Sequence, residues 1–441
     1  MSPLEIASLI FIVTILVLAT GVPIAFGLGF VSVTFIFFFE GLDGILGMGE
    51  MFFGSLSEFT LIAIPMFILM GTAVSSSPTG KDLYKALDSW LYKVPGGLVI
   101  ANLGACTIFS ALSGSSPATC AAIGKMGIPE MQKKGYPDTI ATGSIAAGGT
   151  LGILIPPSVT MIVYGVATET SIGRLFIAGV IPGIILSSLF MLWSIFYISR
   201  YNKKNNIKTV TKTYSLMDKL RLLPKVLPFM IIVMTILYIL YGGLATPSEA
   251  SGVGALFCLV FVVLIYKMWD IKKIWNILKS SMRESTMIMM IIGASALFSY
   301  ALSSLYITQS MAEWIAVLDV NKWVLLAIVN VFLLVAGFFL PPVAVILMTA
   351  PILIPIIISA GFDPYWFAVI LTINMEIGLI TPPVGLNLYV INGITPNVSL
   401  STILRGAFPF VLIMMFSIVL FSIFPEIVTW LPNKMLGEVQ Q

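Results

Sequence analysis

Two stretches of this chain interrupt long apolar runs with glycine and a proline pair, and they limit the possible folds more than any other feature. The first, GGTLGILIPPSVTMIVYG, runs from Gly148 to Gly165, and the second, GLITPPVGLNLYVING, runs from Gly378 to Gly393. A proline removes a backbone donor and clashes with the preceding turn, so each pair should break its helix into halves. Inside a bilayer, broken backbone is tolerated only where it faces protein or a water-filled cavity. Two matching breaks therefore predict a transport site.

The composition is typical of a polytopic membrane protein. Of 441 residues, 58% are hydrophobic and only 10% are charged, against about a quarter in soluble domains. No basic residue precedes the first apolar run, so we expect that run to be a retained span and not a cleaved signal. The net charge of +3 gives no reason to expect a nucleic-acid partner. Histidine is absent and acids are not clustered, which disfavours an intramembrane enzyme.

Apolar runs of membrane-spanning length fill both halves of the chain. We expect spans near residues 4–19, 23–39, 51–74, 138–167 and 175–198, and then near 226–241, 251–266, 285–306, 365–391 and 407–430. Two amphipathic stretches, 75–93 and 308–319, should lie along the membrane surface. In the first of these, an apolar stripe from Leu83 to Leu91 that includes Leu87 and Trp90 is expected opposite Lys81, Lys85 and Asp88.

Two further segments are expected to be re-entrant helical hairpins. The first spans 95–135 and turns at Ser113-Gly114-Ser115-Ser116-Pro117, and the second spans 322–360 and turns at Leu340-Pro341-Pro342. An arm of the first is about 24 Å long at 1.5 Å per residue, which passes the midplane of a bilayer without crossing it. The three cysteines, Cys106, Cys120 and Cys258, lack metal-ligand spacing and are expected in the core.

The second half repeats the first at a nearly constant offset. Gly152, Pro156 and Pro157 recur 226 positions later as Gly378, Pro382 and Pro383. Five crossings per half is an odd number, so the second copy should be inverted, and the fold class is an all-α membrane protein of two inverted repeats. The expected parts are a scaffold with a first arm (1–94), a first transport half (95–168), a span with a basic linker (169–225), a second scaffold with its arm (226–320), a second transport half (321–393) and a last span (394–441).

The distribution of basic residues predicts which side of the membrane each loop faces. Eight of the 23 Lys and Arg residues lie between Arg200 and Lys225 and five between Lys267 and Arg283, and such loops stay cytoplasmic. Both termini are then expected outside. Lys125, in the return arm of the first hairpin, is expected to snorkel toward the cytoplasm.

The first hairpin tip and the first break should meet near the midplane. Carbonyl and hydroxyl oxygens at such turns suit Na⁺, whereas the N-termini of half-helices favour an anionic group. Close helix packing is the alternative use of glycine and serine here. Glu376 is either a functional carboxylate or a structural hydrogen-bond partner, and Glu249 is either functional or the start of a helix. The amides of Asn374, Asn387 and Asn392 have either a structural or a substrate role.

At these residues the chain resembles the large membrane subunit of the tripartite ATP-independent periplasmic (TRAP) transporters. The resemblance rests on SALSGSSPATCAAIG, IPEMQKKGYP, GGTLGILIPPSVTMIVYG, LMTAPILIPI and GLITPPVGLNLYVINGI and covers nearly the whole chain. It implies Na⁺-coupled uptake of an organic acid, such as a C4-dicarboxylate or sialic acid, across a bacterial inner membrane by an elevator-like motion. It also implies a small membrane subunit, here a separate chain, and a periplasmic substrate-binding protein.

The resemblance, together with the tips and breaks, also yields candidate ligands. Substrate contacts are expected from Ser113, Ser116, Ser158 and Asn387. At least two Na⁺ sites are expected from Ser110, Ser113, Gly114, Ser115, Gly149, Thr150, Gly152, Gly337, Leu340, Glu376, Gly378 and Thr381. One departure is Leu340-Pro341-Pro342 at the second tip, where many family members carry an acid. The alternative function is a stand-alone Na⁺ symporter of the divalent-anion type, which shares the plan of inverted hairpins.

Overall fold

The computed structural model describes residues 1–204, 215–317 and 320–437, and within these ranges the chain is built of helices and contains no strand. The helices of the first half are α1 Pro3–Ala19, α2 Ile24–Leu56, α3 Ala63–Ser75, α4 Thr79–Leu91, α5 Gly97–Ser113, α6 Ser116–Lys133, α7 Asp138–Thr150, α8 Val159–Ala167 and α9 Ile172–Lys204. Those of the second half are α10 Leu216–Tyr241, α11 Pro247–Tyr266, α12 Ile271–Ser304, α13 Ile307–Val317, α14 Lys322–Phe339, α15 Pro342–Ser359, α16 Pro364–Leu379, α17 Leu386–Ile394, α18 Leu400–Ile423 and α19 Glu426–Leu436.

Several of these helices can span a membrane, which confirms the expected all-α, multi-span architecture. Seven are long and apolar enough in the described residues, or up to nine if each bent pair is one span. The helices of the second hairpin, α14 and α15, pass this test at 18 residues each, while α5 of the first hairpin is shorter at 17 residues. Helix length therefore does not separate a crossing helix from a re-entrant one here.

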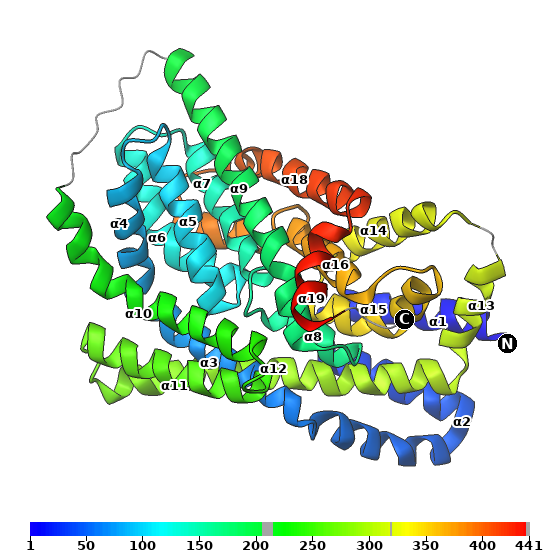
Figure 1. The fold of residues 1–441 in the computed structure, drawn as a ribbon. Coiled ribbons are helices and arrows are strands. Elements are labelled where there is room, and N and C mark those ends of the chain that lie inside the picture. The colour runs from blue at the N-terminus through cyan, green and yellow to red at the C-terminus, as the bar shows by residue number, and fades with distance from the viewer. Residues whose placement is uncertain (205–214, 318–319, 438–441) are drawn as a thin grey trace.

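Figure 1 shows how the helices are arranged. The long helices α2 and α12 pack together along one side of the molecule, with α11 beside α3. The first hairpin, α5 and α6, lies beside α4, whereas α14 and α15 lie toward the end that holds α1. Between them run α7, α9, α16 and α18. Every residue of α16 from Trp366 to Leu379 is buried, so the polar residues Thr372, Asn374 and Glu376 lie inside the protein with the apolar ones.

Helices α7 and α18 approach each other so closely that their backbones touch. A Cβ atom placed on Gly406 would overlap the backbone carbonyl of Thr139, and one placed on Gly143 would overlap the backbone of Gly406. The two backbones thus touch without side chains between them. Glycine permits such contact inside a membrane, where van der Waals packing drives helix association.

Several predicted boundaries were wrong. The expected span 51–74 is divided, because α2 bends at Gly41 (φ 75°) and continues to Leu56 before a 3₁₀ turn and the short α3. The expected span 407–430 is α18 followed by the separate α19, and Pro425 lies between them. The expected basic loop 200–225 is helical at both flanks, and its residues 205–214 lie outside the described residues.

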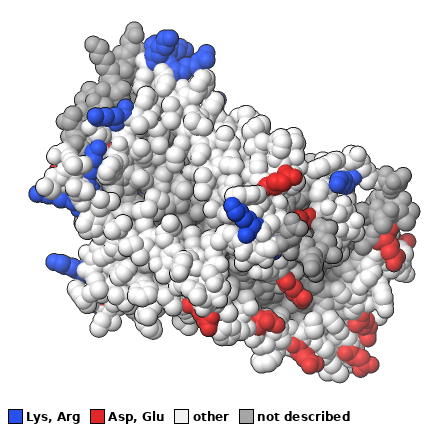
Figure 2. Space-filling view, in the orientation of Figure 1, with Lys and Arg blue, Asp and Glu red and all other residues white. Residues whose placement is uncertain are grey.

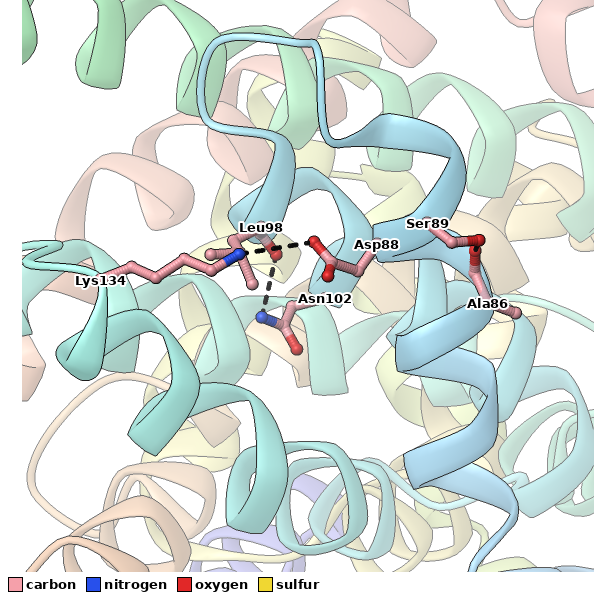
Figure 3. Close-up of polar contacts among 6 residues, drawn as sticks. All are labelled: Ala86, Asp88, Ser89, Leu98, Asn102 and Lys134. Carbon is pink, nitrogen blue, oxygen red and sulfur yellow. Dashed lines mark hydrogen bonds and ion pairs between the residues drawn. The ribbon is translucent and has the colours of Figure 1, made fainter. Parts of the chain in front are cut away.

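The predicted orientation of the first amphipathic stretch was also partly wrong. Asp88 lies on the buried face of α4 and is 6% exposed, whereas Trp90 is 50% exposed. Figure 3 shows Lys134, at the end of α6, reaching toward the Asp88 carboxylate, with a distance of 3.9 Å between Nζ and Oδ1. Below this pair, the Asn102 amide of α5 donates to the Leu98 carbonyl at 2.9 Å. A charge can occupy the buried face because a cation from the hairpin pairs with it.

Asp88→Ala is expected to lower the midpoint of thermal unfolding of the purified protein. The substitution leaves the Lys134 ammonium without its carboxylate and empties a buried position, at a cost of about 1–3 kcal/mol. Glu130→Ala is the matched control, because Glu130 pairs with Lys133 at 3.1 Å on the exposed side of α6. An exposed pair contributes less than about 1 kcal/mol. Equal midpoints for the two variants would show that the pair of Asp88 and Lys134 contributes no more stability than the exposed pair.

Candidate substrate and cation site

The first hairpin tip is a compact set of hydroxyl groups. Helix α5 ends where Gly114 takes a left-handed conformation (φ 58°), and α6 begins two residues later. The hydroxyls of Ser113 and Thr119 lie 2.8 Å apart, and the Thr119 hydroxyl also donates to the Ser115 carbonyl at 3.0 Å. Ser110 is fully buried, 3.5 Å from the Thr119 hydroxyl. Thr119 was missed by sequence reasoning, although its place four residues after Ser115 puts it one turn above the tip.

The first break packs directly on this tip, as predicted. A Cβ on Gly152 would lie 3.2 Å from the Ser115 carbonyl oxygen, and one on Gly149 would overlap the Cys120 sulfur atom. From the other side, a Cβ on Gly114 would lie 3.5 Å from the Pro157 carbonyl oxygen. Only glycine allows the backbone of the break to approach the tip this closely.

Two predicted ligand hydroxyls are used to hold the ends of the broken helix. Ser158 is the N-cap of α8, where its hydroxyl accepts from the Met161 N–H at 3.3 Å and donates to the Ile153 carbonyl at 2.6 Å. The Thr150 hydroxyl donates to the Ala147 carbonyl at 2.6 Å. Both side chains are fully buried. Because both hydroxyl hydrogens are used in these bonds, only the acceptor lone pairs of the two oxygens remain for a ligand.

The second break packs on the second hairpin in the same way. A Cβ on Gly378 would overlap the Gly337 carbonyl, and the Val384 N–H donates to the Phe338 carbonyl at 3.2 Å. The Thr381 hydroxyl donates to the Ile377 carbonyl at 2.7 Å. Leu340 ends α14 in an extended conformation. The proline pair of this break, Pro382 and Pro383, is exposed, whereas the pair of the first break, Pro156 and Pro157, is buried. The two breaks therefore differ in solvent exposure.

Glu376 is the most unusual side chain of the second half. It is 0% exposed, and neither of its carboxylate oxygens has a hydrogen-bond partner among the described residues. The structural hydrogen bond considered as its alternative role is therefore not present in the described part of the chain. A buried carboxylate without donors is costly unless a cation or a proton neutralises it. Glu376 stands 226 positions after Thr150, so it occupies the same position of the repeat.

Asn387 connects the two halves. Its amide nitrogen, from α17, donates to the Ser116 hydroxyl at 2.7 Å and to the Ala146 carbonyl at 3.2 Å. Its Oδ1 atom is buried without a partner among the described residues. On α16, the Asn374 amide donates to the side chain of Asn330 and to the Ile370 carbonyl at 3.2 Å, a pairing that sequence reasoning missed. Asn387 thus joins the first tip, while Asn374 holds α14.

Glu249 proves to be a residue that begins a helix. Its carboxylate accepts from the Thr246 N–H at 2.8 Å and from the Thr246 hydroxyl at 2.9 Å, while the Glu249 N–H donates to that hydroxyl at 3.3 Å. This reciprocal pairing is a capping box at the start of α11. Of the two acids singled out in the sequence, only Glu376 remains a candidate ligand.

The donor set fits a hard monovalent cation. No group of three or more His, Cys, Asp or Glu residues that could hold a metal occurs in 1–204, 215–317 or 320–437. The first half instead offers the hydroxyls of Ser110, Ser113 and Thr119 beside the Ser115 carbonyl. Near the second break, the Glu376 carboxyl group adds two buried oxygen atoms that have no hydrogen-bond partner among the described residues. Oxygen ligands of this kind suit Na⁺ and do not suit zinc or copper, which prefer nitrogen and sulfur.

Comparison with known proteins gives a consistent result. The family model described as "Tripartite ATP-independent periplasmic transporter, DctM component" matches residues 11–427. A C4-dicarboxylate TRAP transporter large permease protein, DctM, from Pseudomonas aeruginosa is 38% identical over 89% of this chain and 90% of its own length. A sialic acid TRAP transporter large permease protein, SiaM, from Vibrio cholerae is 30% identical over 95% of this chain and 97% of its own length. In fold, the chain is similar to the Alcanivorax borkumensis YdaH transporter, with a TM-score of 0.65, 15% identity, and coverage of 90% of this chain and 91% of that one.

Proposed function

The chain belongs to the DctM family of tripartite ATP-independent periplasmic transporters, and we propose that it is the translocating subunit of a Na⁺-coupled importer of an organic acid. It is a multi-pass membrane protein and a transporter permease rather than an enzyme. Family membership implies two partners, a small membrane subunit and a periplasmic binding protein. The observation that carries the proposal is the contact between each hairpin and its own broken helix, with the unpaired Glu376 carboxylate beside the second.

The proposed substrate is an anion with a carboxylate group. Two helix N-termini converge at the first tip, because α6 begins at Ser116 and α8 begins at Val159, and a Cβ on Gly114 would lie 3.6 Å from the Val159 nitrogen. Helix N-termini favour anions through their unpaired N–H groups and dipoles. Relatives named for C4-dicarboxylates and for sialic acid agree with a carboxylate substrate of either type.

The proposed cycle is an elevator, in which the hairpins and broken helices move against the scaffold. Figure 2 supports an orientation of the protein in the membrane. Lys and Arg gather at the end where α9 ends and α10 begins, whereas Asp and Glu predominate around the bend of α2 and at α13. The basic end is the cytoplasmic one by the positive-inside rule. We therefore propose a bacterial inner-membrane location with both termini in the periplasm.

Reconstitution tests this function directly. The chain is placed in liposomes with the small subunit, and binding proteins loaded with succinate or sialic acid are offered under an inward Na⁺ gradient. We expect accumulation of one of these acids with Na⁺ and none when K⁺ replaces Na⁺. Accumulation that persists in K⁺ contradicts the coupling. Uptake that needs no binding protein would instead support a stand-alone divalent-anion symporter.

A further inference from the structure

Lys125 is a cation on α6, a helix of the first hairpin. It lies in the middle of α6, is exposed, and takes part in no ion pair, hydrogen bond or ring contact among the described residues. The nearest acid along the same helix, Glu130, is already paired with Lys133 at 3.1 Å. The other cation at this end of the hairpin, Lys134, faces Asp88. Of the three lysines Lys125, Lys133 and Lys134, only Lys125 has no partner among the described residues.

The surroundings of Lys125 are unlike a lipid-facing surface. Between Gly97 and Ala167, a range that the structure describes completely, no large hydrophobic side chain is exposed. Lipid-facing helices elsewhere expose whole rows of them, as α18 does with Phe408, Leu412, Phe416 and Val419. On the same face of α6, the neighbours of Lys125 toward the tip are the small, half-buried residues Ala118, Ala121 and Ala122, and the half-buried Pro129 follows one turn later. A charged side chain is costly among acyl chains and usually faces protein or a water-filled cavity, so the Lys125 ammonium favours water beside this face.

The distance from the tip determines what this charge can do. Lys125 is nine residues after Ser116, or about 14 Å along the helix axis, on the side toward the basic end of the molecule. A substrate held at the tip is therefore too far away for direct contact. At an ionic strength of 0.1 M the Debye length is about 10 Å, so the charge acts on an anion that has left the tip and is passing along α6.

We propose that Lys125 forms an anion-attracting station in a water-filled vestibule between the first hairpin tip and the cytoplasm, and that it draws the released carboxylate substrate away from the tip. This inference rests on the proposed function for the identity of the anion. The vestibule itself does not depend on it. If Lys125 instead only extended its side chain to the membrane surface, lipid would surround the same face of α6.

Thiol labelling tests the vestibule without any substrate. The native cysteines, Cys106, Cys120 and Cys258, are all buried, so a cysteine introduced at position 125 is read against a low background. In inside-out vesicles, Lys125→Cys is expected to react with a membrane-impermeant, charged methanethiosulfonate reagent. Leu192→Cys, on the apolar and 61% exposed face of α9, is the control and should not react. A Lys125→Cys protein as unreactive as this control overturns the proposal.

Chemical rescue tests the charge. In the reconstituted complex, Lys125→Cys and Lys125→Met are expected to slow exchange of succinate or sialic acid from the cytoplasmic side by about tenfold, within the range known for electrostatic steering. Treatment of Lys125→Cys with 2-aminoethyl methanethiosulfonate restores an ammonium group at nearly the same length and should restore exchange. Methyl methanethiosulfonate should not. Lys133→Met, from the same helix, should exchange at the wild-type rate.

The outcomes separate this inference from the function on which it rests. Equal exchange by Lys125→Met and the wild type, or equal rescue by both reagents, overturns the role of Lys125 and leaves the transport function standing. A wild-type complex that moves neither acid overturns the proposed substrate class, while the labelling result still decides whether the vestibule exists. The steering effect should also shrink as salt rises, because screening shortens its range.

Discussion

Glu376→Gln is expected to abolish the Na⁺ dependence of transport and to lower Na⁺-driven uptake at least about tenfold. The glutamate carboxylate is fully buried, and neither oxygen meets a donor among the described residues. Desolvation makes such an anion unstable unless a cation or a proton neutralises it, and under the proposed function that cation is Na⁺. Glutamine keeps the size of the side chain but removes the charge, so the main electrostatic attraction for the cation is lost. The fold should tolerate the change, since no hydrogen bond among the described residues is broken.

Thermal unfolding of the purified protein measures this effect separately from transport. A ligand that binds only the folded state at 100 times its dissociation constant adds about 2.7 kcal/mol of stability. The wild type should therefore melt at a higher temperature in NaCl than in KCl, and Glu376→Gln should melt at the same temperature in both. Glu249→Gln is the control, because that carboxylate only caps α11, and it should keep the Na⁺ effect. A Glu376→Gln protein that Na⁺ still stabilises fully would show that Glu376 is not a cation ligand.

Gly149→Ala is expected to reduce transport by at least about tenfold, although alanine is the better helix former by about 1 kcal/mol. The added methyl group would overlap the Cys120 sulfur and lie 3.0 Å from the Ser116 carbonyl oxygen. The first hairpin must then shift away from the broken helix. The ligand groups at the tip lose their alignment with the break, which is the geometry that the site requires.

A second substitution checks this explanation. Cys120→Ala removes the sulfur atom with the worst overlap, so the Gly149→Ala/Cys120→Ala protein should recover part of the lost uptake. Recovery should remain incomplete, because the Ser116 carbonyl is still close. Gly252→Ala, where a Cβ meets nothing within 4 Å, should transport at the wild-type rate. If the double variant is no more active than Gly149→Ala alone, the loss has another cause.

The sequence was sufficient to predict the features that depend on local patterns. Apolar runs predicted most helices, and the glycine and proline breaks predicted where two of them divide. The contact between the first tip and the first break followed from their adjacency in the chain. The end of α2 could not be predicted in this way. The expected spans 23–39 and 51–74 leave a gap between them, whereas the chain only bends at Gly41 and continues as helix.

The site was harder to predict because its partners come from distant parts of the chain. Nothing in the sequence indicates that Asn387 would donate to Ser116, 271 residues away, or that Asn374 would meet Asn330. The role of Ser158 could have been recognised, since a serine directly before an apolar helix is a common N-cap. The burial of Asp88 could not, because it depends on Lys134 lying opposite. The inverted orientation of the repeats, the division into scaffold and transport parts, and the Na⁺ sites remain predictions.

The backbone contact between α7 and α18 has a consequence for the boundary of the moving body. Two helices whose main chains touch at Gly143 and Gly406 cannot slide past one another without a clash, since interlocked surfaces are bistable rather than continuously deformable. In an elevator cycle, α18 must then move together with α7 as part of the transport domain. The last span follows both transport halves in the chain, yet it would move with the substrate. The surface along which the transport domain slides against the scaffold must then lie elsewhere.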